Sequence, residues 1–258
     1  GKKYGEIWGY KVDGLFRNDK EAAEYASRID LSTVASGYYT ATGAYGKGVR
    51  GGDIKYLDLN GDNIVNGGKG TLDDPGDRRV IGNSSPRYQY GASLNFSWYG
   101  FDVSVFMQGI GRLDWYPGAD NLRFWGPYCR PYATFVPKNF MSQVWSEENP
   151  DAYFPRARAY TSLNSNSGTA YYTNDRYLQN LAYCRLKNLT IGYTIPRRLT
   201  SKVGIKECRI YFSGENLATW SALKSDFLDP EQAAADSDKK ANVYPWCKTY
   251  SIGLNLTF

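Results

Sequence analysis

The chain has 258 residues, of which 16% are aromatic, and its formal net charge is +5. It contains no apolar run of about 18 residues, which excludes a transmembrane helix. The mild positive charge is scattered and forms no patch for nucleic acid. Without histidine, the common Ser–His and Cys–His nucleophiles are unavailable, so we do not expect an enzyme.

Six segments are predicted to be β-strands, because apolar and polar residues alternate along them. They are Tyr4–Val12, Tyr88–Trp98, Phe101–Gly109, Ala182–Ile195, Glu207–Leu217 and Lys248–Phe258. Only Tyr99 and Gly100 separate the second strand from the third, which predicts a tight hairpin. The last strand alternates most strictly, and its apolar face holds Tyr250, Ile252, Leu254, Leu256 and Phe258.

The connections between these strands alternate between long and short. The long ones are Asp13–Arg87, Ile110–Leu181 and Ala218–Cys247. In an antiparallel meander, this alternation places all long loops at one end, as in outer-membrane barrels with short periplasmic turns. Tyr and Trp, present 23 and 7 times, suit the boundary between membrane and water. The predicted fold class is therefore all-β, a transmembrane antiparallel β-barrel segment with long extracellular loops.

The number of strands is too small for a closed barrel, since about eight is the small end of known barrels. The chain also begins without an initiator Met or a charged-then-apolar leader. We therefore expect a fragment or processed piece, whose sheet is completed by sequence not present here.

An acidic segment resembles the opening of a calcium-binding loop. Asp58, Asn60 and Asp62 place oxygen side chains at positions 1, 3 and 5, and the Ile64 carbonyl occupies position 7. Position 6, usually glycine, is Asn63, which tolerates a left-handed backbone. Position 12 is a lysine, so a later carboxylate must close the site, and Asp77 is the best candidate. The predicted structural Ca²⁺ would bind here; the alternative is a solvated acidic turn without an ion.

Two further groups of residues are candidate sites. Aromatic residues of the second long connection could stack on sugar rings or a partner protein, or could fold the loop upon itself; they are Trp115, Tyr116, Trp125, Tyr128 and Tyr132. The four cysteines show no CxxC spacing, which argues against zinc and leaves disulfide pairing open. Cys184 and Cys208 lie in predicted strands, where we expect them to pack as small apolar residues.

The order of several motifs resembles the C-terminal part of the SusC/RagA family of TonB-dependent outer-membrane transporters of Bacteroidetes. The matching segments are Gly9-Tyr-Lys-Val-Asp-Gly14-Leu-Phe16, Asp53-Ile-Lys-Tyr-Leu-Asp58-Leu-Asn-Gly-Asp62, Asp77-Arg-Arg-Val-Ile-Gly-Asn83-Ser-Ser-Pro86-Arg-Tyr, Phe124-Trp-Gly-Pro127-Tyr, Val144-Trp-Ser-Glu-Glu-Asn-Pro-Asp-Ala-Tyr-Phe-Pro155-Arg, Asn174-Asp-Arg-Tyr-Leu-Gln-Asn180, Leu186-Lys-Asn-Leu-Thr-Ile-Gly-Tyr-Thr-Ile-Pro196, Ser213-Gly-Glu-Asn-Leu217, Asp229-Pro-Glu231 and the terminal Phe258.

The resemblance implies about the last six strands of a 22-stranded barrel that surrounds a plug domain. It also implies a SusD-like surface lipoprotein as partner, contact with outer-membrane lipid, and uptake of glycans or oligopeptides powered through TonB. The plug and the TonB-contacting segment would lie upstream. In the family the acidic loop reaches its closing Asp-Arg pair sooner than here, so the insertion Asn66–Gly76 bears on the last calcium ligand.

Two alternatives remain at the level of sequence. A passive porin-like channel would share the barrel but lack an upstream plug. A soluble carbohydrate-binding β-domain would share the strands and the aromatic loops but would stay in solution without detergent.

Overall fold

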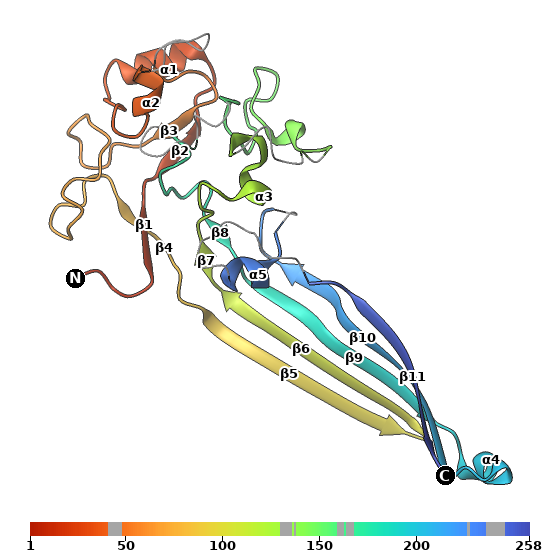
Figure 1. Ribbon diagram of the computed structural model, residues 1–258. Helices are drawn as coiled ribbons and strands as arrows, with labels where there is room; N and C mark the ends of the chain where they lie inside the picture. Colours follow the sequence, from red (N-terminus) through yellow and green to blue (C-terminus); the bar gives the residue numbers. More distant parts are fainter. Residues whose placement is uncertain are drawn as a thin grey trace. The chain divides into compact units, whose positions relative to one another are not determined.

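The computed structural model describes residues 1–40, 48–129, 136, 138–158, 163, 168–225, 228–235 and 246–258 (Figure 1). The strands are β1 (Glu6–Gly9), β2 (Val12–Leu15), β3 (Ile54–Tyr56), β4 (Arg79–Asn83), β5 (Arg87–Trp98), β6 (Phe101–Arg112), β7 (Asp114–Trp115), β8 (Gln179–Asn180), β9 (Tyr183–Thr194), β10 (Glu207–Ser221) and β11 (Thr249–Thr257). The helices are α1 (Asp19–Ala26), α2 (Ser36–Thr40), α3 (Leu122–Trp125), α4 (Arg197–Thr200) and α5 (Pro230–Ala235), with short 3₁₀ turns η1 (Gly126–Tyr128), η2 (Met141–Gln143) and η4 (Ser201–Val203). Among the described residues, no helix combines the length and apolarity that a membrane span requires.

Five long strands form one antiparallel sheet in the order β11-β10-β9-β6-β5. They coincide with five of the six predicted strands, so the predicted all-β class is confirmed. The segment predicted as the first strand, Tyr4–Val12, behaves differently. Only four of its residues form β1, and they pair with β4 in a separate two-stranded sheet. Four extended residues are too few to accompany the 12-residue strand β5 along the main sheet.

The turn between β5 and β6 is the predicted tight hairpin. Trp98 pairs with Phe101 across it, and the two residues between them have φ angles of 46° (Tyr99) and 87° (Gly100). A two-residue turn with positive φ at both positions is the type I′ turn, whose twist matches that of the flanking strands. The register of the whole pair follows from this turn.

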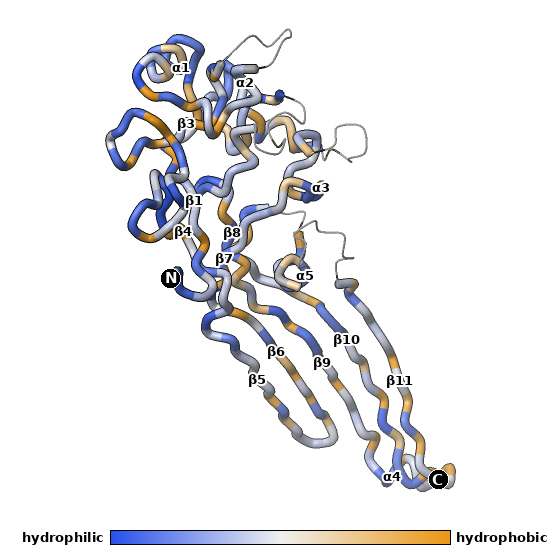
Figure 2. The backbone as a smooth tube through the Cα atoms, turned by 60° about the vertical axis from the view of Figure 1, so that its left-hand side comes forward, coloured by the Kyte–Doolittle hydropathy of each residue, from blue (hydrophilic) through white to orange (hydrophobic). Residues whose placement is uncertain are grey.

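The register places a continuous apolar band on one face of the five-stranded sheet. Neighbouring positions across the strands include Leu94–Val105–Leu189 and Val103–Ile191–Phe212–Ile252. Figure 2 shows the alternation along these strands as a succession of hydrophobic and hydrophilic segments. The band is exposed: 66% of Leu94 and 84% of Ile252 are accessible. An apolar sheet face of this extent indicates contact with another apolar phase.

The opposite face of the sheet is polar, and two glycines on it leave space for long neighbouring side chains. Asp102 and Arg209 form an ion pair, with Arg209 Nε 2.9 Å from the Asp102 carboxylate. A Cβ at Gly192 would lie only 2.5 Å from the Arg209 guanidinium, and a Cβ at Gly253 would overlap the Tyr211 ring. The two glycines therefore let these long side chains lie along the sheet rather than project from it.

A charged cluster on the polar face ties the last long connection to β9. Arg185 is 1% exposed, and its guanidinium pairs with Asp229 and donates to Glu231 at 2.7 Å. Lys187 binds the same Glu231 carboxylate at 2.8 Å. Asp229 accepts the Glu231 N–H at 3.0 Å, which starts helix α5. These charge-assisted contacts hold the start of α5 against the sheet.

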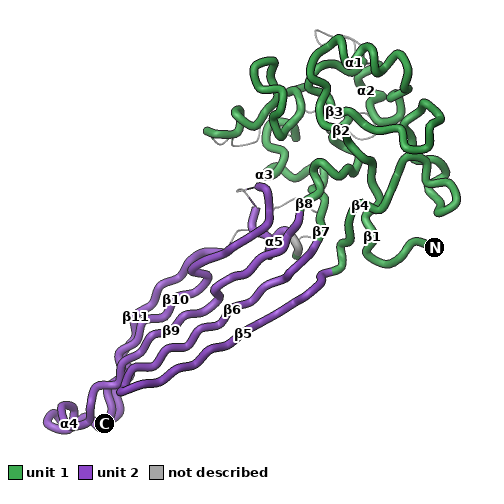
Figure 3. The backbone as a smooth tube through the Cα atoms, turned by 180° about the vertical axis from the view of Figure 1, so that it is seen from behind, with its two compact units in different colours: residues 1–85, 114–179, 235–242 green, residues 86–113, 180–234, 243–258 purple. Residues whose placement is uncertain are grey.

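The chain divides into two compact units, drawn in different colours in Figure 3. Unit 2 comprises 86–113, 180–234 and 243–258 and holds the five-stranded sheet. Unit 1 comprises 1–85, 114–179 and 235–242, so the first two predicted long connections supply most of it. Unit 1 has its own core, and the long loops are thus folded structures rather than extended links.

Candidate functional site

The core of unit 1 is built from aromatic rings. Trp125 is fully buried, and its ring meets Tyr177 edge-on with centroids 5.1 Å apart. Phe154 stacks on Phe140 and Tyr128 at 5.1 and 5.8 Å. Edge-to-face and offset contacts of this kind add stabilisation beyond the area buried. The segment Leu122–Tyr128 therefore coils tightly because its rings are drawn into this core.

The structure places four of the five predicted ligand-stacking aromatics inside this region. Trp115, Trp125 and Tyr128 are buried, and the polar tips of the last two reach backbone carbonyls of Gly118 and Pro155. The burial of these three rings agrees with the alternative stated above, in which the aromatic residues fold the loop upon itself. Tyr116 is buried too, but its ring reaches a pocket wall. Tyr132 lies outside the described residues.

One buried amide joins three parts of unit 1. Asn174 is fully buried, and its side-chain nitrogen donates to the Tyr116 hydroxyl at 3.0 Å and to the Tyr172 carbonyl at 2.8 Å. It also reaches the Tyr56 hydroxyl at 3.3 Å, while its side-chain oxygen accepts the Tyr177 N–H at 3.1 Å. Since a buried polar group is costly when unpaired, this fully used amide fixes the relative positions of its neighbours.

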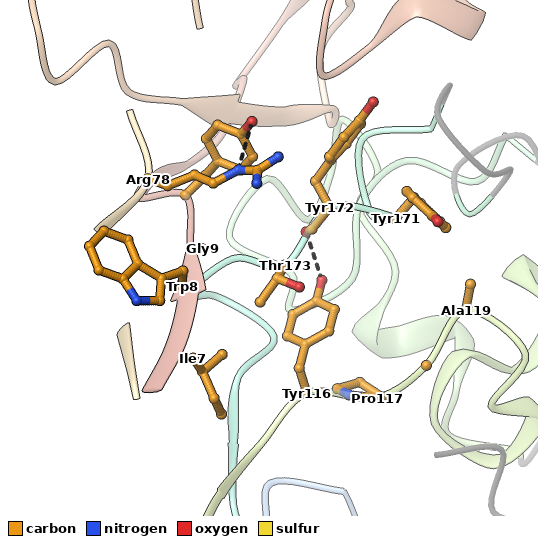
Figure 4. Close-up of a pocket in the computed structure, with 12 residues that line it drawn as sticks. Ile7, Trp8, Gly9, Arg78, Tyr116, Pro117, Ala119, Tyr171, Tyr172 and Thr173 are labelled. Carbon is orange, nitrogen blue, oxygen red and sulfur yellow. Dashed lines mark hydrogen bonds between the residues drawn. The ribbon is translucent and has the colours of Figure 1, made fainter. Parts of the chain in front are cut away.

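A pocket of about 480 Å³ opens beside this amide (Figure 4). That volume lies within the range of small-molecule sites. Its walls come from Ile7 to Tyr10, Arg78, Tyr116 to Ala119 and Tyr171 to Thr173. Strand β1 supplies one wall because the Tyr10 N–H donates to the Thr173 carbonyl at 2.9 Å. All of these residues belong to unit 1.

The charged group of the pocket is Arg78. Its guanidinium lies 5.4 Å from the centroid of the Tyr10 ring, and its Nε is 3.4 Å from the Tyr10 hydroxyl. Gly67 packs behind it, where a Cβ would lie 2.7 Å from the guanidinium carbon. Within the described ranges, neither terminal nitrogen of Arg78 has a hydrogen bond or an ion pair. In Figure 4 the guanidinium end of Arg78 points toward the side of the pocket where Tyr172 lies.

Two phenols of the pocket, Tyr116 and Tyr172, have raised pKa values and remain neutral at physiological pH. Burial raises the pKa of Tyr116 well above its usual value. Burial also raises the pKa of Tyr172, although the nearby Arg78 charge works in the opposite direction. Among the described residues of the pocket lining, none carries a carboxylate, a thiol or an imidazole. The described lining thus combines a single cation with aromatic rings.

The acidic loop folds as a compact turn. Asp58 accepts the N–H groups of Gly61 at 2.7 Å and Asn63 at 2.9 Å, and Asp62 accepts the Ile64 N–H at 2.9 Å. Asn63 has a φ of 64°, the left-handed conformation predicted for this position. Asn60 donates to the Asp62 carboxylate at 2.9 Å. The backbone of this turn therefore bends in the way expected for the opening of a calcium-binding loop.

Asp77 joins the same loop despite the intervening insertion. It is fully buried, and its two carboxylate oxygens accept the N–H groups of Leu59 at 2.7 Å and Asn66 at 2.8 Å. Its oxygens are thus occupied by backbone donors. Across the described residues, no group of three or more Asp, Glu or Cys side chains is placed to hold a metal ion. The oxygen atoms of this loop are of the kind that Ca²⁺ binds. In this structure, however, the carboxylates accept hydrogen bonds from the backbone of the loop.

Sequence reasoning missed most of the pocket. Trp8, Tyr10, Arg78 and Tyr172 are far apart in the chain and carry no local signal of a site. Two of them do fall within segments used for the family resemblance, those that begin at Gly9 and at Asp77. The presence of two such motif segments at one pocket is the signal from which the pocket could have been predicted.

No family model matches the sequence. Among curated proteins, two TonB-dependent receptors of Formosa agariphila are similar. Receptor P26 is 28% identical over 215 residues, covering 80% of this chain and 20% of that protein. Receptor P3 is 25% identical over 267 residues, covering 100% and 22%. The chain thus spans about a fifth of the length of these relatives, which confirm the predicted resemblance to TonB-dependent receptors.

Solved structures of the RagAB peptide transporter share the fold. One matches with a TM-score of 0.57 and 20% identity, over 98% of this chain and 23% of that one. The RagAB peptide importer in an open-open state matches with a TM-score of 0.55 and 18% identity, over 98% and 22%. The predicted fold class, a segment of such a receptor's β-barrel, is confirmed by these matches.

Proposed function

We propose that this chain, a relative of the TonB-dependent receptors, forms part of an outer-membrane active transporter that imports glycans or oligopeptides. The observation that supports this most directly is the exposed apolar band across five strands, opposite a polar face. In a membrane barrel, lipid covers such a band and the polar face lines the lumen. The folded loops of unit 1 would then form part of the extracellular binding chamber.

The partners follow from the same proposal. A SusD-like lipoprotein would cover the loops, and the rest of the barrel would complete the sheet. A plug would occupy the lumen and move when TonB pulls on it, so that captured substrate passes along the polar wall. This segment would contribute wall, lumen lining and loops, and no catalytic step.

Cell fractionation and uptake test this proposal in cells that carry the complete gene. We expect the protein in the outer-membrane fraction and uptake of labelled oligopeptides or oligosaccharides that stops when TonB is deleted. A passive porin-like channel would keep its uptake without TonB. A soluble carbohydrate-binding domain would appear in the soluble fraction. Either of these results would reject the transporter.

We also propose that the acidic loop binds a structural Ca²⁺ through Asp58, Asn60, Asp62, the Ile64 carbonyl and Asp77. The turn geometry and the oxygen donors support it. Binding would require the loop carboxylates to share their lone pairs between the ion and the backbone N–H groups. The ion would brace a long connection that otherwise loses conformational entropy on folding.

Replacing Asp58 and Asp62 together with alanine should lower thermal stability more in calcium buffer than in chelator, where only their hydrogen bonds to the loop backbone are lost. Bound calcium stabilises the native state by about 2.7 kcal/mol at one hundred times its dissociation constant. Differential scanning fluorimetry of the purified protein measures the effect. Asp73→Ala, at an exposed carboxylate of the same loop, is the matched control and should change little. An equal loss of stability in calcium and in chelator would reject the site.

A further inference from the structure

We propose that the pocket around Arg78 captures the carboxylate of a short peptide, with the apolar side chain next to that carboxylate lying against the aromatic walls. This inference rests on the proposed transport function and names the ligand class of one subsite. It starts from the single charge of the pocket, because a partly buried guanidinium without an anionic partner favours a carboxylate ligand.

The environment of Arg78 leaves its outer edge available. The Tyr10 ring covers one face of the guanidinium. Gly67, from another segment of the chain, also packs against the guanidinium. Only its Nε is engaged, by a long 3.4 Å contact to the Tyr10 hydroxyl. No ion pair to Arg78 occurs in the part of the chain that the structure describes. Both terminal nitrogens can therefore donate in the two-pronged geometry that matches a carboxylate.

Three of the polar side chains at the pocket already have hydrogen-bond partners. The Tyr116 hydroxyl donates to carbonyls of Ala170 and Tyr172 and accepts from Asn174. The Tyr172 hydroxyl donates to the Thr33 carbonyl at 2.8 Å, and the Trp8 indole N–H donates to Glu6 at 3.1 Å. The hydroxyls of Tyr171 and Thr173, which also line the pocket, have no hydrogen bond within the described ranges. They can bind the amide groups next to the ligand's carboxylate.

A short peptide fits these groups better than a sugar acid does, because only the peptide joins its carboxylate to an apolar side chain that can lie against the aromatic rings. The pocket volume of about 480 Å³ suits one or two amino-acid residues rather than a long chain. The aromatic rings of Trp8, Tyr10 and Tyr116 come from two separate segments of the lining.

Isothermal titration of the complete protein in detergent tests the proposal with three probes. They are acetyl-Ala-Leu-Phe with a free carboxylate, the same tripeptide as its amide, and a galacturonic acid trimer. We expect the acid to bind about ten- to a hundredfold more tightly than the amide, the ratio that a charge-assisted hydrogen bond provides. The acid should also bind more tightly than the sugar acid.

Arg78→Gln should remove the preference of acid over amide, and Arg78→Lys should keep part of it because the charge remains without the fork. Arg28→Gln, at an exposed arginine of the same unit outside the pocket, is the matched control and should keep the full preference. A loss that is equal for acid and amide would mean that Arg78 only supports the fold, and would reject the proposal.

Three results with the wild-type protein would also overturn it: equal binding of acid and amide, tighter binding of the sugar acid, or no binding of any probe. The outer-membrane location and the TonB dependence of uptake are measured separately. If these hold while the titration fails, the pocket assignment is wrong and the transport function stands. If the protein is not in the outer membrane, the function itself fails.

Discussion

Replacing Arg185 with methionine should lower the free energy of unfolding by about 3–5 kcal/mol, the loss found when one partner of a buried ion pair is removed. The Arg185 side chain is 2% exposed, and it neutralises Asp229 and Glu231, which are 13% and 23% exposed. Methionine fills a similar volume but leaves Asp229 without a cation. Lys187 still holds Glu231, so the loss should concentrate on Asp229.

Urea unfolding of the complete protein in detergent measures this loss. Arg198→Met, at an exposed arginine of helix α4, is the control and should stay within about 0.5 kcal/mol of wild type. In the Arg185→Met background, Asp229→Asn should restore part of the stability, because it removes the uncompensated charge. If Asp229→Asn costs the same in both backgrounds, the two side chains are not coupled and the contact is unimportant.

Leu94→Lys should destabilise the membrane-inserted protein by about 2–4 kcal/mol, the cost of a lysine facing the middle of a bilayer. Leu94 of β5 lies in the apolar band. It is paired with Val105 on the neighbouring strand, and its side chain is exposed. The cost arises because the ammonium group must lose its hydration or pull water into the lipid. This prediction depends on the proposed membrane location.

The adjacent Asn95 provides a matched control, since successive side chains of a strand point to opposite faces. Asn95→Lys places the same charge on the polar face and should change stability by less than about 1 kcal/mol. Heat-modifiable migration after refolding into lipid vesicles compares the two variants. Equal stability of both would show that the apolar band does not face lipid.

The long strands could be predicted because their pattern is local. Alternation fixed the ends of β5 to within one residue, and the two-residue spacing revealed the hairpin at Tyr99. The same method could not see that the alternation changes phase within β9. A bulge around Lys187 brings Leu186 onto the same apolar face as Leu189. A second irregularity between Glu215 and Ala218, near Asn216 with a φ of 53°, interrupts β10 but returns it to the same phase.

The pocket and the charged cluster could not be predicted because their residues meet only through the tertiary fold. Arg185 sits in a strand whose alternation gives no hint of partners 44 and 46 residues away. The aromatic residues were visible in the sequence, yet their count does not distinguish a loop core from a binding surface. The acidic loop lies between these cases. Its turn and the return of Asp77 to it were predicted from the sequence, but the backbone N–H groups that occupy the Asp77 oxygens were not.

The fully bonded Asn174 amide has a consequence for how a ligand would be bound. A flexible loop that closes on its ligand loses conformational freedom, at about 0.5–1.5 kcal/mol for each immobilised side chain. Here the amide already joins the rings of Tyr56 and Tyr116 to the chain at Tyr172. The amide thus fixes the Tyr116 and Tyr172 parts of the wall before any encounter, so these parts would bind a ligand without an ordering step. Exchange of one wall residue would then alter selectivity while the rest of the chamber keeps its shape.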